Sequence, residues 1–174
     1  ARLSGAIVDK QPNRLVVDVN GVGYEVAVPL STFYHLPDTG SQVSLRVHTH
    51  VREDAFLLFG FATAEEKALF ERLITVAGIG PKLALSVLSG LPVPELVRAI
   101  AAQDVKRLSS IPGVGRTLAE RLGVELKDKV VGIVSATSAP VLESAAAGDG
   151  LFEDAVGALV NLGYKPPQAD AAAD

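Results

Sequence analysis

A thirteen-residue segment that occurs twice, 35 positions apart, is the feature that most constrains the fold of this chain. The segments 72–84 and 107–119 are identical at six positions at this offset. The identical pairs are Arg72 and Arg107, Leu73 and Leu108, Gly78 and Gly113, Gly80 and Gly115, Leu83 and Leu118, and Ala84 and Ala119. So dense a match at one offset indicates an internal repeat, and therefore two copies of one local structure.

Each copy joins two apolar helical runs through a short Gly-x-Gly turn, GIGPK in the first and GVGRT in the second. Glycine permits positive φ and lets another group approach the backbone closely. The helix after the turn presents unpaired amide groups and the positive end of its dipole. An anion is the expected ligand, with Lys82 and Arg116 beside it. We interpret the two copies as helix-hairpin-helix motifs that bind DNA backbone phosphates at two points without reading bases.

The same glycines are also compatible with other structures. Gly-x-Gly is common at helix C-termini, so either turn alone can be a tight connection that binds nothing. A nucleotide-binding loop does not fit the spacing. None of GVGYEV, GIGPKL and GVGRTL has the sixth-position glycine of a dinucleotide fingerprint, and no G-x-x-x-x-G-K followed by Ser or Thr occurs. We therefore expect no cofactor and no ATP hydrolysis by this chain itself.

The first 62 residues predict a small barrel of about five short strands, with an OB-fold as the candidate. RLVVDVN and YEVAVP flank an Asn-Gly hairpin signal, and VSLRVHTHV alternates strictly. One face of that last strand carries Val43, Leu45, Val47, Thr49 and Val51, and the other carries Arg46, His48, His50 and Arg52. The two histidines also suit a metal ion, but the adjacent arginines favour a polar, DNA-facing surface, and we expect no metal.

From Thr63 the hydrophobic period becomes helical. Thr63 and Glu66 form a capping-box pattern, and helices are expected at 81–89, 94–102, 104–110 and 116–129. Residues 63–133 carry ten basic and eight acidic side chains, whereas 134–174 carry one and six. The net charge of −4 is therefore concentrated in the tail, and the helical segment remains suited to phosphate.

The remaining sequence predicts a linker at 134–150, rich in Ala, Ser and Gly, and a small helical domain at 151–174. Because its 24 residues are too few for an independent core, we expect that domain either to be incomplete or to dock on another surface. No run is apolar for long enough to span a membrane, no secretory signal begins the chain, and cysteine is absent. We expect a soluble, cytoplasmic protein.

Five stretches together resemble the bacterial RuvA family. They are VNGVGYEVAVP, VREDAFLLFGF, GIGPKLALSVLSG, IPGVGRTLAERLGVELKDK and ALVNLGYKP, in the family's order and spacing. The resemblance implies an OB-fold domain (1–62), a tandem helix-hairpin-helix DNA-binding domain (63–133), a flexible linker and a UBA-like C-terminal domain. It implies a non-catalytic homotetramer, or an octamer, that binds Holliday junctions and holds them open for branch migration in recombination and repair. The implied partners are four-way junction DNA, the RuvB motor ATPase and the RuvC resolvase.

The resemblance also implies roles for individual residues. Those implied for phosphate binding are Gly78, Gly80 and Lys82 in the first turn, and Gly113, Gly115 and Arg116 in the second. Glu53 and Asp54 match an acidic pin that repels DNA strands at the crossover. Leu159, Leu162 and Tyr164 match the segment that contacts the motor. Where the family usually has a Lys-Lys pair, this chain has Arg116 and Thr117.

Two other classes of function remain open on the sequence alone. A small helix-hairpin-helix repair enzyme needs a catalytic Asp or Lys after the second hairpin, where Lys127, Asp128 and Lys129 stand. Those three are explained more simply as charges at a helix end. An adaptor that binds only protein would use the tail helices. Glu53 and Asp54 are likewise compatible with a solvated turn or with nuclease metal ligands, although adjacent strand residues point to opposite faces.

Overall fold

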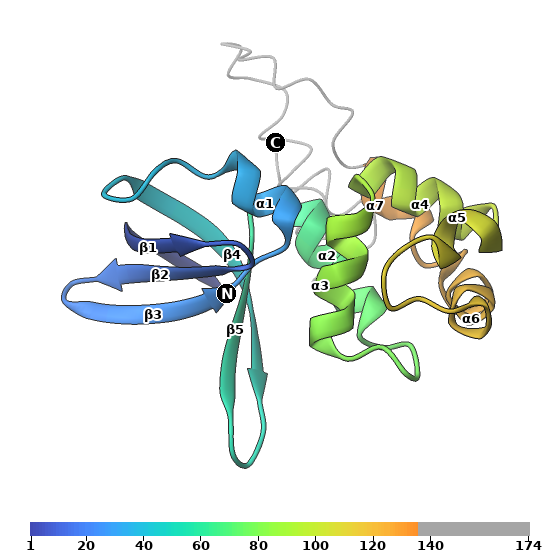
Figure 1. Ribbon diagram of the computed structural model, residues 1–174, viewed down its shortest axis with the longest axis horizontal. Helices are drawn as coiled ribbons and strands as arrows, with labels where there is room; N and C mark the ends of the chain where they lie inside the picture. The colour runs from blue at the N-terminus through green and yellow to red at the C-terminus, as the bar shows by residue number, and fades with distance from the viewer. Residues whose placement is uncertain (136–174) are drawn as a thin grey trace, which may run out of the picture. The chain divides into compact units, whose positions relative to one another are not determined.

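The computed structural model describes residues 1–135, and within them the N-terminal segment is a closed five-stranded barrel in the order β1-β2-β3-β5-β4 (Figure 1). The strands are β1 (Arg2–Gln11), β2 (Arg14–Val19), β3 (Val22–Ala27), β4 (Gln42–Val51) and β5 (Phe56–Phe61). Neighbouring strands are antiparallel except β3 and β5, which are parallel. The predicted OB-fold barrel is confirmed. The predicted C-terminal domain, with Leu159, Leu162 and Tyr164, lies outside the described residues.

The barrel interior follows the alternation seen in the sequence, but only along part of β4. Val43, Leu45 and Val47 are buried there, whereas Thr49 is exposed and Val51 is 67% exposed. The face predicted from the alternation is therefore buried only in its N-terminal half. Beyond Val47, β4 and β5 continue together as a ribbon whose tip projects from the other strands (Figure 1). Leu58, opposite Thr49, still packs against the barrel core, whereas Val51 and its partner Phe56 are exposed.

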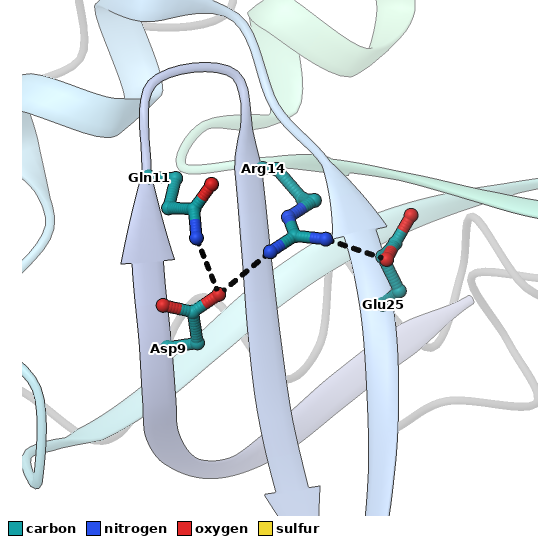
Figure 2. Close-up of polar contacts among 4 residues, drawn as sticks. All are labelled: Asp9, Gln11, Arg14 and Glu25. Carbon is teal, nitrogen blue, oxygen red and sulfur yellow. Dashed lines mark hydrogen bonds and ion pairs between the residues drawn. The ribbon is translucent and has the colours of Figure 1, made fainter.

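On the barrel surface, Arg14 of β2 links the two strands beside it (Figure 2). Its guanidinium lies 2.8 Å from Asp9 Oδ2 on β1 and 3.2 Å from Glu25 Oε2 on β3. Gln11 Nε2 also donates to Asp9 Oδ2, at 3.1 Å. These groups are largely solvated, so each pair contributes little stability, but together they favour one register of the three strands.

The predicted helical segment is confirmed, with small changes at its ends. A short helix in the barrel part of the sequence, α1 (Leu30–His35), joins β3 to β4 and was not predicted. The helices that follow are α2 (Ala64–Leu73), α3 (Pro81–Gly90), α4 (Val93–Ala101), α5 (Val105–Ser109), α6 (Arg116–Leu126) and α7 (Val131–Ser135). Helix α6 ends three residues before the predicted 129, and α7 was not predicted. Among residues 1–135 no single helix is long and apolar enough to cross a membrane; α3 and α4 meet that test only jointly, with a 103° bend between them.

The barrel and the helices share a continuous apolar core. Phe59 and Phe61 of β5 are buried against Phe70 of α2, with ring centroids 5.2 and 4.9 Å apart. Both phenylalanines belong to the same cluster as the buried residues of α3 to α6. Position 62 therefore marks a change of secondary structure inside one packed unit.

Glu66 forms the polar part of the same joint. The predicted capping box is present, because Thr63 Oγ1 accepts from Glu66 N at 3.1 Å and the Glu66 carboxylate lies back over the Thr63 amide. The carboxylate is 5% exposed and also accepts from Ser31 Oγ at 2.5 Å and Thr32 Oγ1 at 2.7 Å. The backbone amide of Ala62 donates to it at 3.1 Å. One side chain therefore connects α1, the end of β5 and the start of α2.

Replacement of Glu66 by Ala is expected to lower the free energy of unfolding by about 2 to 4 kcal/mol, because it removes a helix cap and leaves buried donors without an acceptor. Urea denaturation followed by far-ultraviolet circular dichroism measures the change. Glu25→Ala is the matched control, since it removes a carboxylate of the exposed network in Figure 2 and should cost less than about 1 kcal/mol. Equal effects of the two substitutions would contradict the role given to Glu66.

Candidate nucleic-acid interface

The two Gly-x-Gly turns have nearly the same backbone geometry. Gly78 and Gly113 follow the last turn of helix with φ of 94° and 87°, a region that favours glycine. In each turn the next residue is a buried aliphatic anchor, Ile79 or Val114, and each anchor is 4% exposed. The anchor amides donate to Val76 O and Ile111 O, at 3.0 Å in both copies. The internal repeat therefore forms the same structure twice, as the sequence predicted.

The helices that follow the turns begin with open, uncapped ends. Gly80 and Gly115 are the N-cap residues of α3 and α6, with φ, ψ of −84°, 171° and −79°, 170°. Both are exposed, neither offers a capping side chain, and a Cβ built on either would meet no atom within 4 Å. The first amide N–H groups belong to Lys82 in α3, because Pro81 before it has none, and to Arg116 in α6; no capping side chain accepts from either helix end, which suits both ends to an oxyanion.

The two hairpins pack on each other through equivalent residues. A Cβ built on Gly113 would lie 2.8 Å from Leu83 Cδ1, and one built on Gly78 would lie 3.7 Å from Leu118 Cδ1. Leu83 and Leu118 occupy the same position of the repeat, so the contact is reciprocal. The two turns are therefore held at a fixed separation.

Arg121 adds a polar contact between the hairpins that the sequence analysis missed. Its Nη1 donates to the carbonyl oxygen of Ala77 in the first turn, at 2.8 Å. The repeat gave no signal for this residue, because the position 35 residues earlier is Ser86.

Each turn carries one cation close to the open helix end. Lys82, the second residue of α3, is exposed and has no ion-pair partner within residues 1–135. Arg116, the first residue of α6, is 85% exposed and lies 3.0 Å from Glu120 Oε1. That exposed i,i+4 pair is weak, so an anion can compete for the guanidinium. The structure thus brings each predicted cation to its turn.

The ribbon of β4 and β5 carries Glu53 and Asp54 at its tip. The tip is closed by Arg52 N, which donates to Ala55 O at 2.8 Å. Both carboxylates are exposed and neither forms an ion pair with another described residue. An open hollow of about 690 Å³ is lined by Asp54 from this ribbon and by Gly80 and Lys82 from the first turn. The negative tip and one candidate phosphate-binding turn therefore border the same space.

The predicted polar face of β4 does not form one surface. Arg46 is exposed, while His50 and Arg52 line the same hollow as Lys82, with Arg52 Nε donating to His50 Nε2 at 3.0 Å. His48 instead faces α2, where its ring lies 5.3 Å from that of Phe70 and its Nδ1 lies 3.1 Å from Glu71 Oε1.

The structure also shows where the residues needed for the alternative enzymatic functions lie. Among residues 1–135 there is no group of three or more His, Asp or Glu side chains arranged to hold a metal ion. Lys127, Asp128 and Lys129 are exposed and follow the end of α6.

Comparison with known proteins matches both parts of the described structure. Residues 1–60 match the RuvA N terminal domain family, and residues 70–128 match the SAM-like helix-hairpin-helix tandem family. A protein of Syntrophotalea carbinolica named Holliday junction branch migration complex subunit RuvA is 51% identical over 165 residues, covering 95% of this chain and 83% of the relative. Proteins with the same name from Acidobacterium capsulatum and Pseudomonas putida are 53% and 49% identical, covering 97% and 98% of this chain and 84% and 86% of the relatives.

The chain belongs to the RuvA family. The resemblance inferred from the five sequence stretches is thereby confirmed. The two matched segments cover the barrel and the helical region from the end of α2 to α6, which contains both turns. The roles of individual residues stay predictions.

Replacement of three of the four turn glycines, Gly113, Gly78 and Gly115, by alanine should lower stability by different amounts. Gly113→Ala should cost most, about 2 to 4 kcal/mol, because positive φ strains alanine by about 1 to 2 kcal/mol and the new methyl group clashes with Leu83. Gly78→Ala should incur the φ strain alone, and Gly115→Ala less than about 1 kcal/mol, because position 115 is open and extended. Thermal melts of the three variants measure the order, and a Gly115 variant less stable than the Gly113 variant would contradict the geometry.

Proposed function

We propose that this chain is a non-catalytic, structure-specific DNA-binding protein that recognises four-way junctions through backbone phosphates and holds them open for branch migration. The observation that carries the proposal is the pair of equivalent turns, each with an uncapped, solvent-facing helix N-terminus and a neighbouring cation. Amide groups at helix ends and basic side chains are the usual donors to phosphate oxygens, and such contacts are independent of sequence. The names of the relatives support a junction as the ligand.

The two turns suit a rigid, double-stranded backbone better than a single phosphate. They pack on each other reciprocally, so the separation between the two candidate phosphate sites is set by the fold before DNA binds. A duplex arm presents its phosphates at regular spacing, and a preorganised pair of sites loses little conformational entropy when it binds them. We propose that Gly78, Gly80 and Lys82 bind one phosphate group and Gly113, Gly115 and Arg116 another.

Glu53 and Asp54 are proposed to supply selectivity through repulsion. A carboxylate about 5 Å from a phosphate is repelled by about 1 kcal/mol even at the dielectric constant of water. Four subunits around one junction would bring eight such groups near the crossover, where they disfavour a continuous duplex and favour separated strands. This is selection against the wrong ligand as well as for the right one.

A homotetramer is proposed as the working assembly, with an octamer formed from two of them. Exposed apolar side chains on β3 and on the β4–β5 ribbon support self-association: Val22, Tyr24, Val51, Phe56 and Leu57 are each at least 36% exposed. Such residues are typical of surfaces that become buried in an assembly. A four-fold arrangement would give each junction arm its own pair of turns.

The remaining partners are proposed from the family. The RuvB ATPase would supply the motor, which this chain lacks, and RuvC would act on the same junction. Leu159, Leu162 and Tyr164, in the domain proposed for 151–174 after a linker at 134–150, are proposed to contact the motor. The domains proposed for 1–62 and 63–133 would remain bound to DNA while the motor turns over in the cytoplasm.

Replacing Lys82 and Arg116 together by Ala should weaken binding to a synthetic four-way junction at least about tenfold, because two charge-assisted phosphate contacts per subunit are lost. The plot of log affinity against log salt should become shallower by about 1 for each phosphate contact removed. Fluorescence anisotropy at several salt concentrations measures both quantities. Arg98→Ala with Lys129→Ala is the control, since it removes the same charge from exposed positions away from the turns. Unchanged affinity and slope in the first variant would refute the phosphate sites.

Glu53→Gln with Asp54→Asn should tighten binding to linear duplex and so narrow the preference for the junction, because the repulsive charges are removed while shape is kept. Competition between a junction and a duplex with the same arm sequences measures the preference. Asp38→Asn with Asp128→Asn changes the net charge equally at exposed positions outside the ribbon tip and should leave the preference unchanged. Weaker duplex binding by the first variant would count against a repulsive pin.

A further inference from the structure

A second hollow adjoins Lys82 on another side of α3 and extends toward the second turn. It has a volume of about 480 Å³ and is separate from the hollow that borders the acidic ribbon. Lys82, Ser86 and Ser89, spaced by four and three residues along one face of α3, form one wall. Asn13, in the turn between β1 and β2, and Pro112, directly before Gly113, line it as well. The hollow therefore connects the first phosphate-binding turn with the start of the second.

The chemistry of this hollow matches the backbone of a nucleic acid. Lys82 is its only charged lining residue, and no carboxylate lines it. Its apolar lining comes from Ala27, Leu30 and Leu85, with hydroxyl and amide groups beside them from Ser86 and Asn13. An apolar surface suits the carbon face of a deoxyribose, and a positive, hydrogen-bonding edge suits its phosphate. The hollow beside the ribbon differs, because Glu25 and Asp54 line it.

Ser86 offers a free hydroxyl donor in this hollow, beside Lys82. It is exposed, and its hydroxyl has no hydrogen-bond partner within residues 1–135. The Ser89 hydroxyl is already used, since it donates to Leu85 O at 2.7 Å and accepts from Leu30 N at 3.0 Å. Ser86 follows Lys82 by four residues, which places it about 6 Å further along the helix axis. A strand held at Lys82 can therefore present its neighbouring phosphate to Ser86.

Asn13 faces the same space from the barrel. Its backbone is fixed at φ of 66°, and its carbonyl oxygen accepts from Val28 N at 3.0 Å, so the residue is held in place. Its side chain is exposed and has no hydrogen-bond partner among the described residues. An ordered backbone with an unpaired amide side chain provides a second donor across the hollow from Ser86.

We propose that this hollow is a third DNA-backbone site, in which Ser86 and Asn13 bind the sugar-phosphate segment that runs from the first turn toward the second. The inference rests on the proposed function and adds to it a contact outside both Gly-x-Gly turns. Through Asn13, the barrel as well as the helices would contact DNA directly. The occupant is the phosphodiester backbone of one strand of a duplex arm, argued from the charge of the hollow and its continuity with Lys82.

Charge substitutions at position 86 test the site against a synthetic four-way junction. Ser86→Lys should tighten binding about threefold to tenfold at low salt and steepen the salt dependence by about 1, whereas Ser86→Glu should weaken binding by a similar factor. Ser86→Ala should weaken it about threefold, as should Asn13→Gly, which keeps the positive φ and removes the amide. Ser44→Lys and Ser44→Glu are the controls, because Ser44 is an exposed serine on β4 whose hydroxyl bonds only to that of Ser4 among described residues.

The outcomes separate this inference from the proposed function. If both charge variants at position 86 bind like the unmodified protein while the Lys82 and Arg116 double variant is weakened, the third site is wrong and the two turns stand. If the double variant also binds normally, the phosphate-binding function itself fails. Equal responses at positions 86 and 44 would show a general charge effect and would overturn the third site. Circular dichroism melts of each variant confirm that α3 and the barrel remain folded.

Discussion

The buried carboxylate of Glu66 is the interaction on which the geometry of the rest depends. Burial of a carboxylate without hydrogen-bond partners would be unfavourable. This carboxylate accepts from two hydroxyl groups of α1 and from the amides of Ala62 and Thr63. Those donors come from the barrel and from the chain that leaves it, while the carboxylate belongs to α2. Phe59, Phe61 and Phe70 also pack together at this joint, but apolar contacts are non-directional. The directional hydrogen bonds of Glu66 select one orientation of the helices on the barrel.

The glycines of the two turns serve packing and exposure at once. Gly78 and Gly113 need positive φ, and at Gly113 a side chain would also clash with Leu83 of the opposite copy. Gly80 and Gly115 touch nothing and leave the helix ends open. The same short sequence thus fixes the spacing of the two turns with its first glycine and keeps a site accessible with its second. Duplication of that sequence is sufficient to produce two sites in a defined relation.

Local signals predicted most of this structure because they act over few residues. The repeat, the capping box of Thr63 and Glu66 and the strand alternation were each readable in the sequence. Helices α1 and α7, of six and five residues, were missed because so short a helix shows little period. Helix α5 is as short, but Asp104 marks its start in the sequence. The positions of His48 and Arg121 depend on what folds against them, α2 for the one and the first turn for the other. The donors at Asn13 and Ser86 likewise meet only because barrel and helices share a core.

A chain with a net charge of −4 can bind a polyanion only if position outweighs total charge. At physiological ionic strength exposed charges act over about 8 Å, so the charges close to a bound phosphate matter more than the net charge of the chain. Within that range the cations at Lys82 and Arg116 attract a phosphate, and the carboxylates at the ribbon tip repel one. In the proposed function, selectivity for a branched backbone would follow from the distance between these attractive and repulsive groups. The joint at Glu66 orients the helices on the barrel, so the proposed discrimination between a junction and a duplex would depend on a contact that lies outside both turns.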